Sequence, residues 1–261
     1  MEDFHVHSTF SDGSASPEEV VQAAVRLGMT RLGFADHGYA PYDLDCCMKQ
    51  EMIPAYLDQI RSLSVRYADK LEIYCGVEQD LFSTQSTELF DYVIGSVHYL
   101  HMEGQYIPVD YREQDLLTAA DRFFGGDCMC LAEEYFRTVS AVYDATRCDL
   151  IGHFDLISKL NLGNRFFNEE DPRYTAAWRA AADRLLPCGV PFEINTGAIA
   201  RGYRTVPYPN SPMIRYLSDN GARFVLSSDS HSPDHLCYDF DRQYCNAAAL
   251  GAEFVPFLSS H

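Results

Sequence analysis

The sequence has few basic residues, no long apolar stretch and no paired-cysteine motif. It carries 20 Lys and Arg against 38 Asp and Glu, a formal net charge of −18. Because nucleic acids are bound by basic surfaces, this imbalance argues against long nucleic acid as a partner. No apolar run approaches the roughly 20 residues that a membrane helix needs, so we expect no membrane-spanning segment.

Nine cysteines are scattered along the chain, and none of them forms a C-x-x-C pair. The pairs Cys46–Cys47 and Cys128–Cys130 are spaced too closely for an ordinary zinc ribbon. Glu2 and Asp3 follow the first methionine, where a secretory signal would carry basic residues and then an apolar segment. We therefore expect a cytoplasmic protein with reduced cysteines that mostly fill the core.

The rest of the composition is that of an ordinary globular protein. The chain has 261 residues, of which 47% are hydrophobic. This length suits one sizeable core, and a single α/β barrel often needs about this many residues. We expect one domain that spans residues 1–261.

Short apolar runs alternate with amphipathic helical patterns along most of the chain. Helices are predicted from Ser16 to Gly28 and over residues 49–69, 112–124, 131–146, 172–186 and 211–220. The seven apolar runs are DFHV, TRLGFADHG, KLEIYCGVEQD, FDYVIGSVHYL, CDLIGHFD, VPFEINTG and ARFVLSSDSH. This alternation favours βα units and a parallel sheet. Whether AEFVPF forms an eighth strand is left open.

Polar residues fall at the C-terminal end of nearly every apolar run. In a flat doubly wound sheet, the site would gather at one switch point between strands. In a βα barrel, by contrast, all strand ends converge on one face. The sequence therefore predicts an α/β fold, specifically a distorted (β/α)7 TIM-like barrel with a metal site at the C-terminal ends of the strands.

The side chains at these strand ends are six histidines and three carboxylates. Imidazole suits zinc and iron, and carboxylate also suits manganese. Each residue alone has an ordinary reading as a hydrogen-bonded polar group, but the set points to metal binding. One tetrahedral zinc takes about four ligands, so the set indicates two or three divalent ions. The predicted ligands are His5, His7, Asp12, His37, Glu78, His98, His153, Asp229 and His231.

Six blocks of the sequence resemble the motifs of the PHP superfamily, named for polymerase and histidinol phosphatase domains. They are HVHSTFSDG, FADHG, GVE, GSVH, GHFD and SSDSH, in the expected order along nearly the whole chain. SPEEVVQAAVRLGMTRLGFADHG and FEINTGAIARGYRTVPYPN are similar to the histidinol-phosphate phosphatases of this superfamily. The resemblance implies one PHP metallophosphoesterase domain, a (β/α)7 barrel and a trinuclear metal centre.

The resemblance also implies how the ligands divide among the metals. It gives His5, His7, Glu78 and Asp229 to the first metal, Glu78, His98 and His153 to the second, and Asp12, His37 and His231 to the third. Some relatives have histidine where this chain has Asp12. The identity of the metals therefore stays open among zinc, iron and manganese.

Hydrolysis of a phosphate ester suits such a centre. Metal ions roughly 3.5–4 Å apart clamp a phosphate and activate a water molecule as nucleophile. From their positions, we expect Asp12, His231 and Arg201 to act in catalysis. A guanidinium fork matches phosphate oxygens, and Arg201 and Arg165 resemble phosphate-contacting positions of the subgroup. His101 lies close enough to the barrel mouth to contact substrate.

The subgroup implies hydrolysis of L-histidinol phosphate by attack of a metal-bound hydroxide, a step of histidine biosynthesis. The expected partners are a small phosphorylated substrate and inorganic phosphate, and acidic loop residues such as Asp43 or Asp45 are candidates for binding the substrate ammonium. An alternative is that the same site acts on another small phosphate monoester or on a nucleotide. A non-catalytic metal-binding module is a third interpretation, against which the full ligand set argues.

Overall fold

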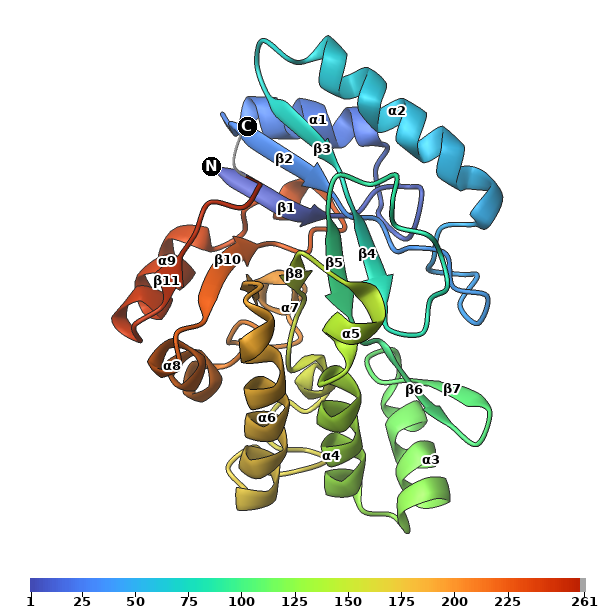
Figure 1. Ribbon diagram of the computed structural model, residues 1–261, viewed down its shortest axis with the longest axis vertical. Coiled ribbons are helices and arrows are strands. Elements are labelled where there is room, and N and C mark those ends of the chain that lie inside the picture. Colours follow the sequence, from blue (N-terminus) through green and yellow to red (C-terminus); the bar gives the residue numbers. More distant parts are fainter. Residues whose placement is uncertain (259–261) are drawn as a thin grey trace.

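The computed structural model describes residues 1–258, which fold as a ring of parallel strands with helices around it (Figure 1). Gly76 joins β3 to β4, and these two segments pair with different neighbours, β3 with β2 and β4 with β5. They are therefore two halves of one strand position. The ring consists of β1 (Glu2–Val6), β2 (Arg31–Phe34), β3 (Glu72–Cys75), β4 (Val77–Asp80), β5 (Val93–Ser96), β8 (Leu150–Ile151), β9 (Phe192–Asn195) and β10 (Arg223–Ser227).

Two isolated bridges close the ring. Val6, at the end of β1, bridges Ser230 beyond β10, and His37 beyond β2 bridges Glu78 in β4. Within residues 1–258 this gives seven strand positions, all parallel. The predicted distorted (β/α)7 TIM-like barrel is therefore confirmed. The AEFVPF segment forms β11 (Glu253–Phe254), which pairs with the start of β10 outside the ring and adds no barrel position.

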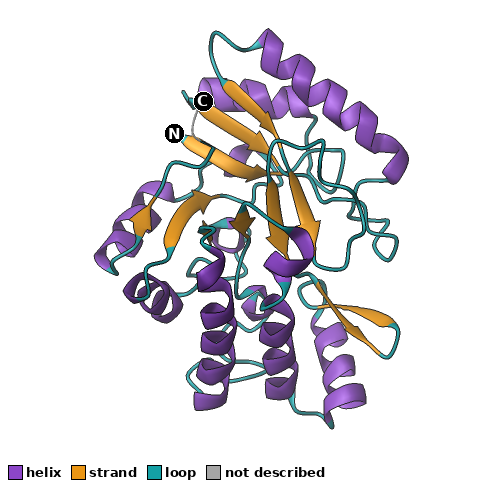
Figure 2. Cartoon of the chain, viewed as in Figure 1, coloured by secondary structure: helices purple, strands orange, loops and turns teal. Residues whose placement is uncertain are grey.

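Helices cover the outside of the barrel, α1 and α2 on one side and α4 and α6 on another (Figure 2). The segment predicted as one helix over 131–146 is divided between α4 and α5. None of the helices in the described residues is long and apolar enough to cross a membrane. The helices are α1 (Pro17–Arg26), α2 (Ile53–Arg66), α3 (Glu113–Phe124), α4 (Cys128–Val139), α5 (Val142–Thr146), α6 (Pro172–Leu185), α7 (Gly197–Ala200), α8 (Ser211–Asp219) and α9 (Phe240–Ala249).

Local sequence explains where the first helix begins. The Ser16 hydroxyl accepts the backbone N–H of Glu19, and the Glu19 carboxylate accepts the backbone N–H of Ser16 at 2.8 Å. This is the capping box that the sequence predicts. Because it ends the preceding loop, it also limits the length of the segment that carries Asp12.

An antiparallel hairpin of β6 (Tyr99–Met102) and β7 (Gln105–Pro108) was not predicted. It projects from the barrel beside α3 (Figure 1). Glu103 and Gly104 form its turn with φ values of 48° and 79°, the positive values that a two-residue hairpin turn requires. The hairpin begins directly after His98 and so borders the C-terminal face of the barrel.

Aromatic side chains fill the opposite end of the barrel. The Tyr92 hydroxyl donates to the carbonyl oxygens of Phe4 at 2.7 Å and Phe34 at 3.0 Å. Gly33 and Gly76 let its ring approach, because a Cβ at either position would overlap it. Phe257 packs edge-on against both Phe4 and Tyr92. Side chains therefore fill this end of the barrel, and the polar side chains of the predicted site lie at the opposite end.

Candidate metal centre

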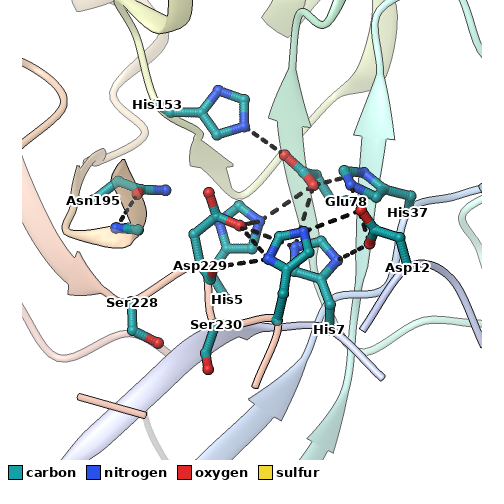
Figure 3. A network of polar contacts seen from close by, with 12 residues as sticks. His5, His7, Asp12, His37, Glu78, His153, Asn195, Ser228, Asp229 and Ser230 are labelled. Atoms are coloured by element: carbon teal, nitrogen blue, oxygen red, sulfur yellow. Dashed lines mark hydrogen bonds and ion pairs between the residues drawn. The ribbon is translucent and has the colours of Figure 1, made fainter. Parts of the chain in front are cut away.

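The C-terminal face of the barrel brings all nine predicted ligands into one cluster, part of which is drawn in Figure 3. His5 and Glu78 lie in strands, and the other seven lie in the loops that follow β1, β2, β5, β8 and β10. Parallel strands that close into a barrel present all these ends on one face. Residues separated by more than 200 positions therefore become neighbours.

Glu78 is the centre of the cluster and is 1% exposed. Its Oε1 lies 2.7 Å from His153 Nε2 and 3.4 Å from His98 Nε2. Its Oε2 lies 2.9 Å from His37 Nδ1 and 3.3 Å from His5 Nε2. Burial alone would raise the pKa of Glu78, but the imidazoles of His5, His37 and His98 hold it well below its ordinary value. Glu78 is thus a carboxylate with histidines on both of its oxygens.

A second group lies around the two aspartates. His7 Nε2 is 3.2 Å from Asp229 Oδ1, and His231 Nε2 is 3.2 Å from Asp12 Oδ2. His37 Nε2 lies 3.7 Å from Asp12 Oδ1 and so connects this group to Glu78. Burial would raise the pKa of Asp12, but the three histidines around it hold that pKa far below its ordinary value. Burial would also raise the pKa of Asp229, but Arg201 and His5 hold it well below its ordinary value. Both aspartates are therefore anionic at neutral pH and can act as ligands.

Several polar atoms of the cluster have no hydrogen-bond partner. They include His5 Nε2, both ring nitrogens of His7, Glu78 Oε2 and His153 Nδ1, and each of these residues is at most 2% exposed. Leaving a buried polar group unpaired costs about 1–3 kcal/mol. Imidazole nitrogens and a carboxylate oxygen that lack hydrogen bonds in one buried cluster are atoms that a divalent ion can bind. The donor set therefore fits bound metal.

The ligand atoms fall into three overlapping groups, each with its atoms within 4.8 Å of one another. The groups are His7, Asp12, His37 and His231; His5, His7 and Asp229; and His37, Glu78 and His98. They parallel the three metals that the resemblance implies, with three differences: His7 and His37 each occur twice, Glu78 is absent from the group of His5, and His153 is outside all three groups. His153 still contacts the Glu78 carboxylate directly.

The carboxylates set the protonation of the histidines. Burial lowers the pKa of His5 and of His37, but carboxylates outweigh it. Glu193 and Glu78 raise the pKa of His5 well above its ordinary value, and Glu78 and Asp12 raise that of His37 to about 10. For His7, burial and two neighbouring imidazoles lower the pKa to about 3. His7 is therefore neutral, with a lone pair available for a metal.

Two carboxylates that sequence analysis did not place in the site support its histidines. Glu193 accepts from His5 Nδ1 at 2.6 Å and from the backbone N–H of His153 at 2.8 Å. Asp80 accepts the backbone N–H of His98 at 2.8 Å and the Tyr42 hydroxyl at 2.6 Å. The available signal was a charged residue inside an apolar strand run, because carboxylates are almost never fully buried unless paired.

A cavity of about 160 Å³ opens onto the cluster, and two basic side chains line it. Arg201 lies 3.0 Å from both Asp229 Oδ2 and His231 Nδ1, so the structure places this predicted phosphate-binding residue beside the ligands. Lys159, which sequence analysis did not single out, pairs with Asp110 at 2.7 Å on the cavity wall. The cavity thus combines a metal-binding floor with two cations.

The structure does not bring the other two predicted substrate-binding residues to this cavity. The Arg165 side chain is 60% exposed and forms an ion pair with Glu113 outside it. His101 lies on the β6–β7 hairpin, is exposed and stacks on Tyr106 with ring centroids 4.5 Å apart. Neither side chain is among those that line the cavity.

Comparison with known proteins agrees with this architecture. Residues 3–197 match the family model described as "PHP domain", and the chain belongs to that family. It is similar to the "Probable histidinol-phosphatase" of Deinococcus radiodurans, with 30% identity over 98% of this chain and 95% of the relative. It is also similar to the "Histidinol-phosphatase" of Bacillus subtilis, with 22% identity over 92% of this chain and 96% of the relative.

A solved structure shares the fold. It is the crystal structure of histidinol phosphate phosphatase from Lactococcus lactis, complexed with zinc, L-histidinol and phosphate. The two structures align with a TM-score of 0.75 and 20% sequence identity, covering 99% of this chain and 96% of the other. The likeness extends over the whole barrel.

Proposed function

We propose that the protein hydrolyses L-histidinol phosphate to L-histidinol and inorganic phosphate, with two or three divalent metal ions. The observation that carries this proposal is the convergence of six imidazoles and three carboxylates beneath a cavity that also holds Arg201 and Lys159. The substrate is supported by full-length similarity to proteins named as histidinol-phosphatases.

All nine clustered residues would hold the metals in this proposal. The division suggested by the resemblance agrees with the short distances around Glu78, which would bridge the first two ions. Zinc is supported by the donor set and by the zinc in the Lactococcus lactis enzyme. Iron and manganese accept the same nitrogen and oxygen donors.

Metals bound here would supply Lewis-acid activation of a water molecule and would neutralise charge on the phosphate. Side chains of the protein would bind and orient the phosphate. Arg201 offers a planar fork to the phosphate oxygens, and Lys159 offers a second positive charge. His231 Nε2 lies 3.2 Å from Asp12 Oδ2, and these two side chains, which would hold one of the metals, are proposed to assist the leaving alcohol oxygen by placing the positive charge of that metal near it.

Phosphate release by metal-reconstituted protein tests the proposal. The panel contains L-histidinol phosphate, sugar phosphates, mononucleotides and p-nitrophenyl phosphate. We expect kcat/KM for L-histidinol phosphate to exceed that for every other ester. Activity on other esters with none on L-histidinol phosphate would retain the metal chemistry and reject the substrate. Absence of all activity with metals bound would favour a non-catalytic role.

A further inference from the structure

One carboxylate in the cavity is without a positive partner. Six carboxylates line the cavity, and five of them have an Arg, Lys or His nitrogen within 4 Å. These five are Asp12, Glu78, Asp80, Asp110 and Asp229. Asp43 is the exception within residues 1–258, with no such nitrogen within that distance.

Asp43 is held in place by neutral donors. Its Oδ2 accepts the Tyr99 hydroxyl at 2.6 Å, and its Oδ1 accepts the backbone N–H of Cys46 at 3.2 Å. Burial and the Asp43 charge raise the pKa of Tyr99, so the phenol stays protonated and donates. The adjacent Tyr42 is anchored to Asp80 at 2.6 Å. The carboxylate is therefore oriented in advance, which lowers the cost of binding a ligand.

The same cavity shows independently that it is built for a ligand. Glu78 lines the cavity, and its buried Oε2 has no hydrogen-bond partner, although ring nitrogens of His37 and His5 lie 2.9 and 3.3 Å away. Arg201 and Lys159 supply positive charge suited to a phosphate. The cavity thus contains a site for an anion together with one half-buried, oriented and unmatched negative charge.

Building on the proposed function, we propose that Asp43 binds the ammonium group of the substrate. The site then selects phosphate monoesters of amino alcohols, because an ester without the amine leaves this carboxylate unmatched. Asp45, two residues further on, is exposed and does not line the cavity. The structure therefore distinguishes two acids that are equivalent in the sequence.

The test uses metal-reconstituted protein and two matched esters, L-histidinol phosphate and 3-(imidazol-4-yl)propyl phosphate, which lacks only the amine. We expect wild type to prefer the amine ester. Asp43→Asn should reduce this preference, measured as the ratio of the two kcat/KM values, by about 10- to 100-fold, the range of a hydrogen bond to a charged group. The change should arise in KM. Asp45→Asn should keep the wild-type ratio.

Equal losses on both esters would overturn the proposal, since Asp43 would then support the site as a whole. An unchanged ratio of the two kcat/KM values would also overturn it.

A binding measurement separates failure of the ammonium site from failure of the proposed function. Calorimetry compares L-histidinol with 3-(imidazol-4-yl)propan-1-ol on metal-loaded protein with inorganic phosphate present. If wild type does not hydrolyse L-histidinol phosphate but binds the amine alcohol more tightly, and Asp43→Asn removes that difference, the proposed function fails and the ammonium site stands. If neither alcohol binds preferentially, the ammonium site fails.

Discussion

Glu193 Oε1 lies 2.6 Å from His5 Nδ1, although 188 positions separate the two residues in the chain. The second oxygen of Glu193 accepts the backbone N–H of His153 at 2.8 Å. One buried carboxylate thus fixes the ring of a β1 histidine and the end of β8. With its Nδ1 engaged, His5 directs Nε2 towards Glu78 and Asp229. A carboxylate behind a ligating histidine orients the ring and raises its basicity.

We expect Glu193→Gln to weaken metal binding, because the amide keeps the shape but removes the charge behind His5. Loss of such a supporting group typically costs about 10- to 100-fold in metal affinity. Competition with a chromogenic zinc chelator measures the change, and circular dichroism checks the fold. Wild-type zinc affinity in the variant would show that His5 needs no charged partner.

His98→Ala should remove one ligand while leaving the barrel folded, since barrel stability lies mostly in the core. Turnover should fall by roughly two orders of magnitude or more, because bound metals would act directly on the reacting phosphate. The amount of bound metal per chain, measured by inductively coupled plasma mass spectrometry, should fall as well. Wild-type turnover together with wild-type metal content would contradict the assignment of His98.

Arg201→Ala should raise KM for the phosphate substrate by about 10- to 100-fold, the worth of a charge-assisted hydrogen bond. The metals should be retained, because the arginine contacts ligands without being one. Arg165→Ala is the matched control. Its guanidinium lies outside the cavity in an exposed ion pair, and such pairs contribute little. Equal effects of the two substitutions on KM would refute the distinction.

The metal-free protein should lose stability as the pH rises from 7 to 9. The pKa of His37 is about 10 in the folded protein against 6.5 for the free side chain, so its contribution is complete below 6.5 and is lost as the pH rises through about 10. The pKa values of His5 and His98 are shifted in the same direction. The lowered pKa of His7 affects stability only below pH 6.5, so it does not contribute to the change between pH 7 and 9.

Zinc-loaded protein should respond differently to the same change in pH. Ligating imidazoles are neutral, so zinc binding becomes stronger as the pH rises. Zinc at 100 times its dissociation constant adds about 2.7 kcal/mol to the free energy of unfolding. Urea midpoints at pH 7 and 9, with and without zinc, measure both effects. Parallel pH profiles for the two forms would show that zinc does not bind these histidines.

Local chemistry made the barrel and the histidine cluster predictable. The βα alternation gives the fold class. Seven of the nine predicted ligands lie in loops that follow strands, and His5 and Glu78 lie within strands, so a closed ring brings all of them to one face. Glu193 was harder to assign because its partner His5 lies in β1, which β10 separates from β9 in the ring, so the two side chains meet only across the interior of the folded barrel. Arg165 is the opposite case. Its resemblance to a phosphate-contacting position predicted a place in the cavity, but its side chain pairs with Glu113 outside the cavity. Such long-range packing is not encoded in residue spacing.

Phe257 packs against Phe4 and Tyr92 at the end of the barrel opposite the metal ligands. The Arg31 guanidinium donates to the Phe257 carbonyl oxygen at 2.7 Å. Packing around Phe4 in β1 thus depends on a residue that lies beyond the last strand of the ring. Because domains generally fold as units, the core of the barrel is complete only when β1 and the segment around Phe257 are both present. The ligand set is likewise complete only in the closed ring, because His5 lies in β1 and His231 follows β10, and the bridge from Val6 to Ser230 brings these two segments together.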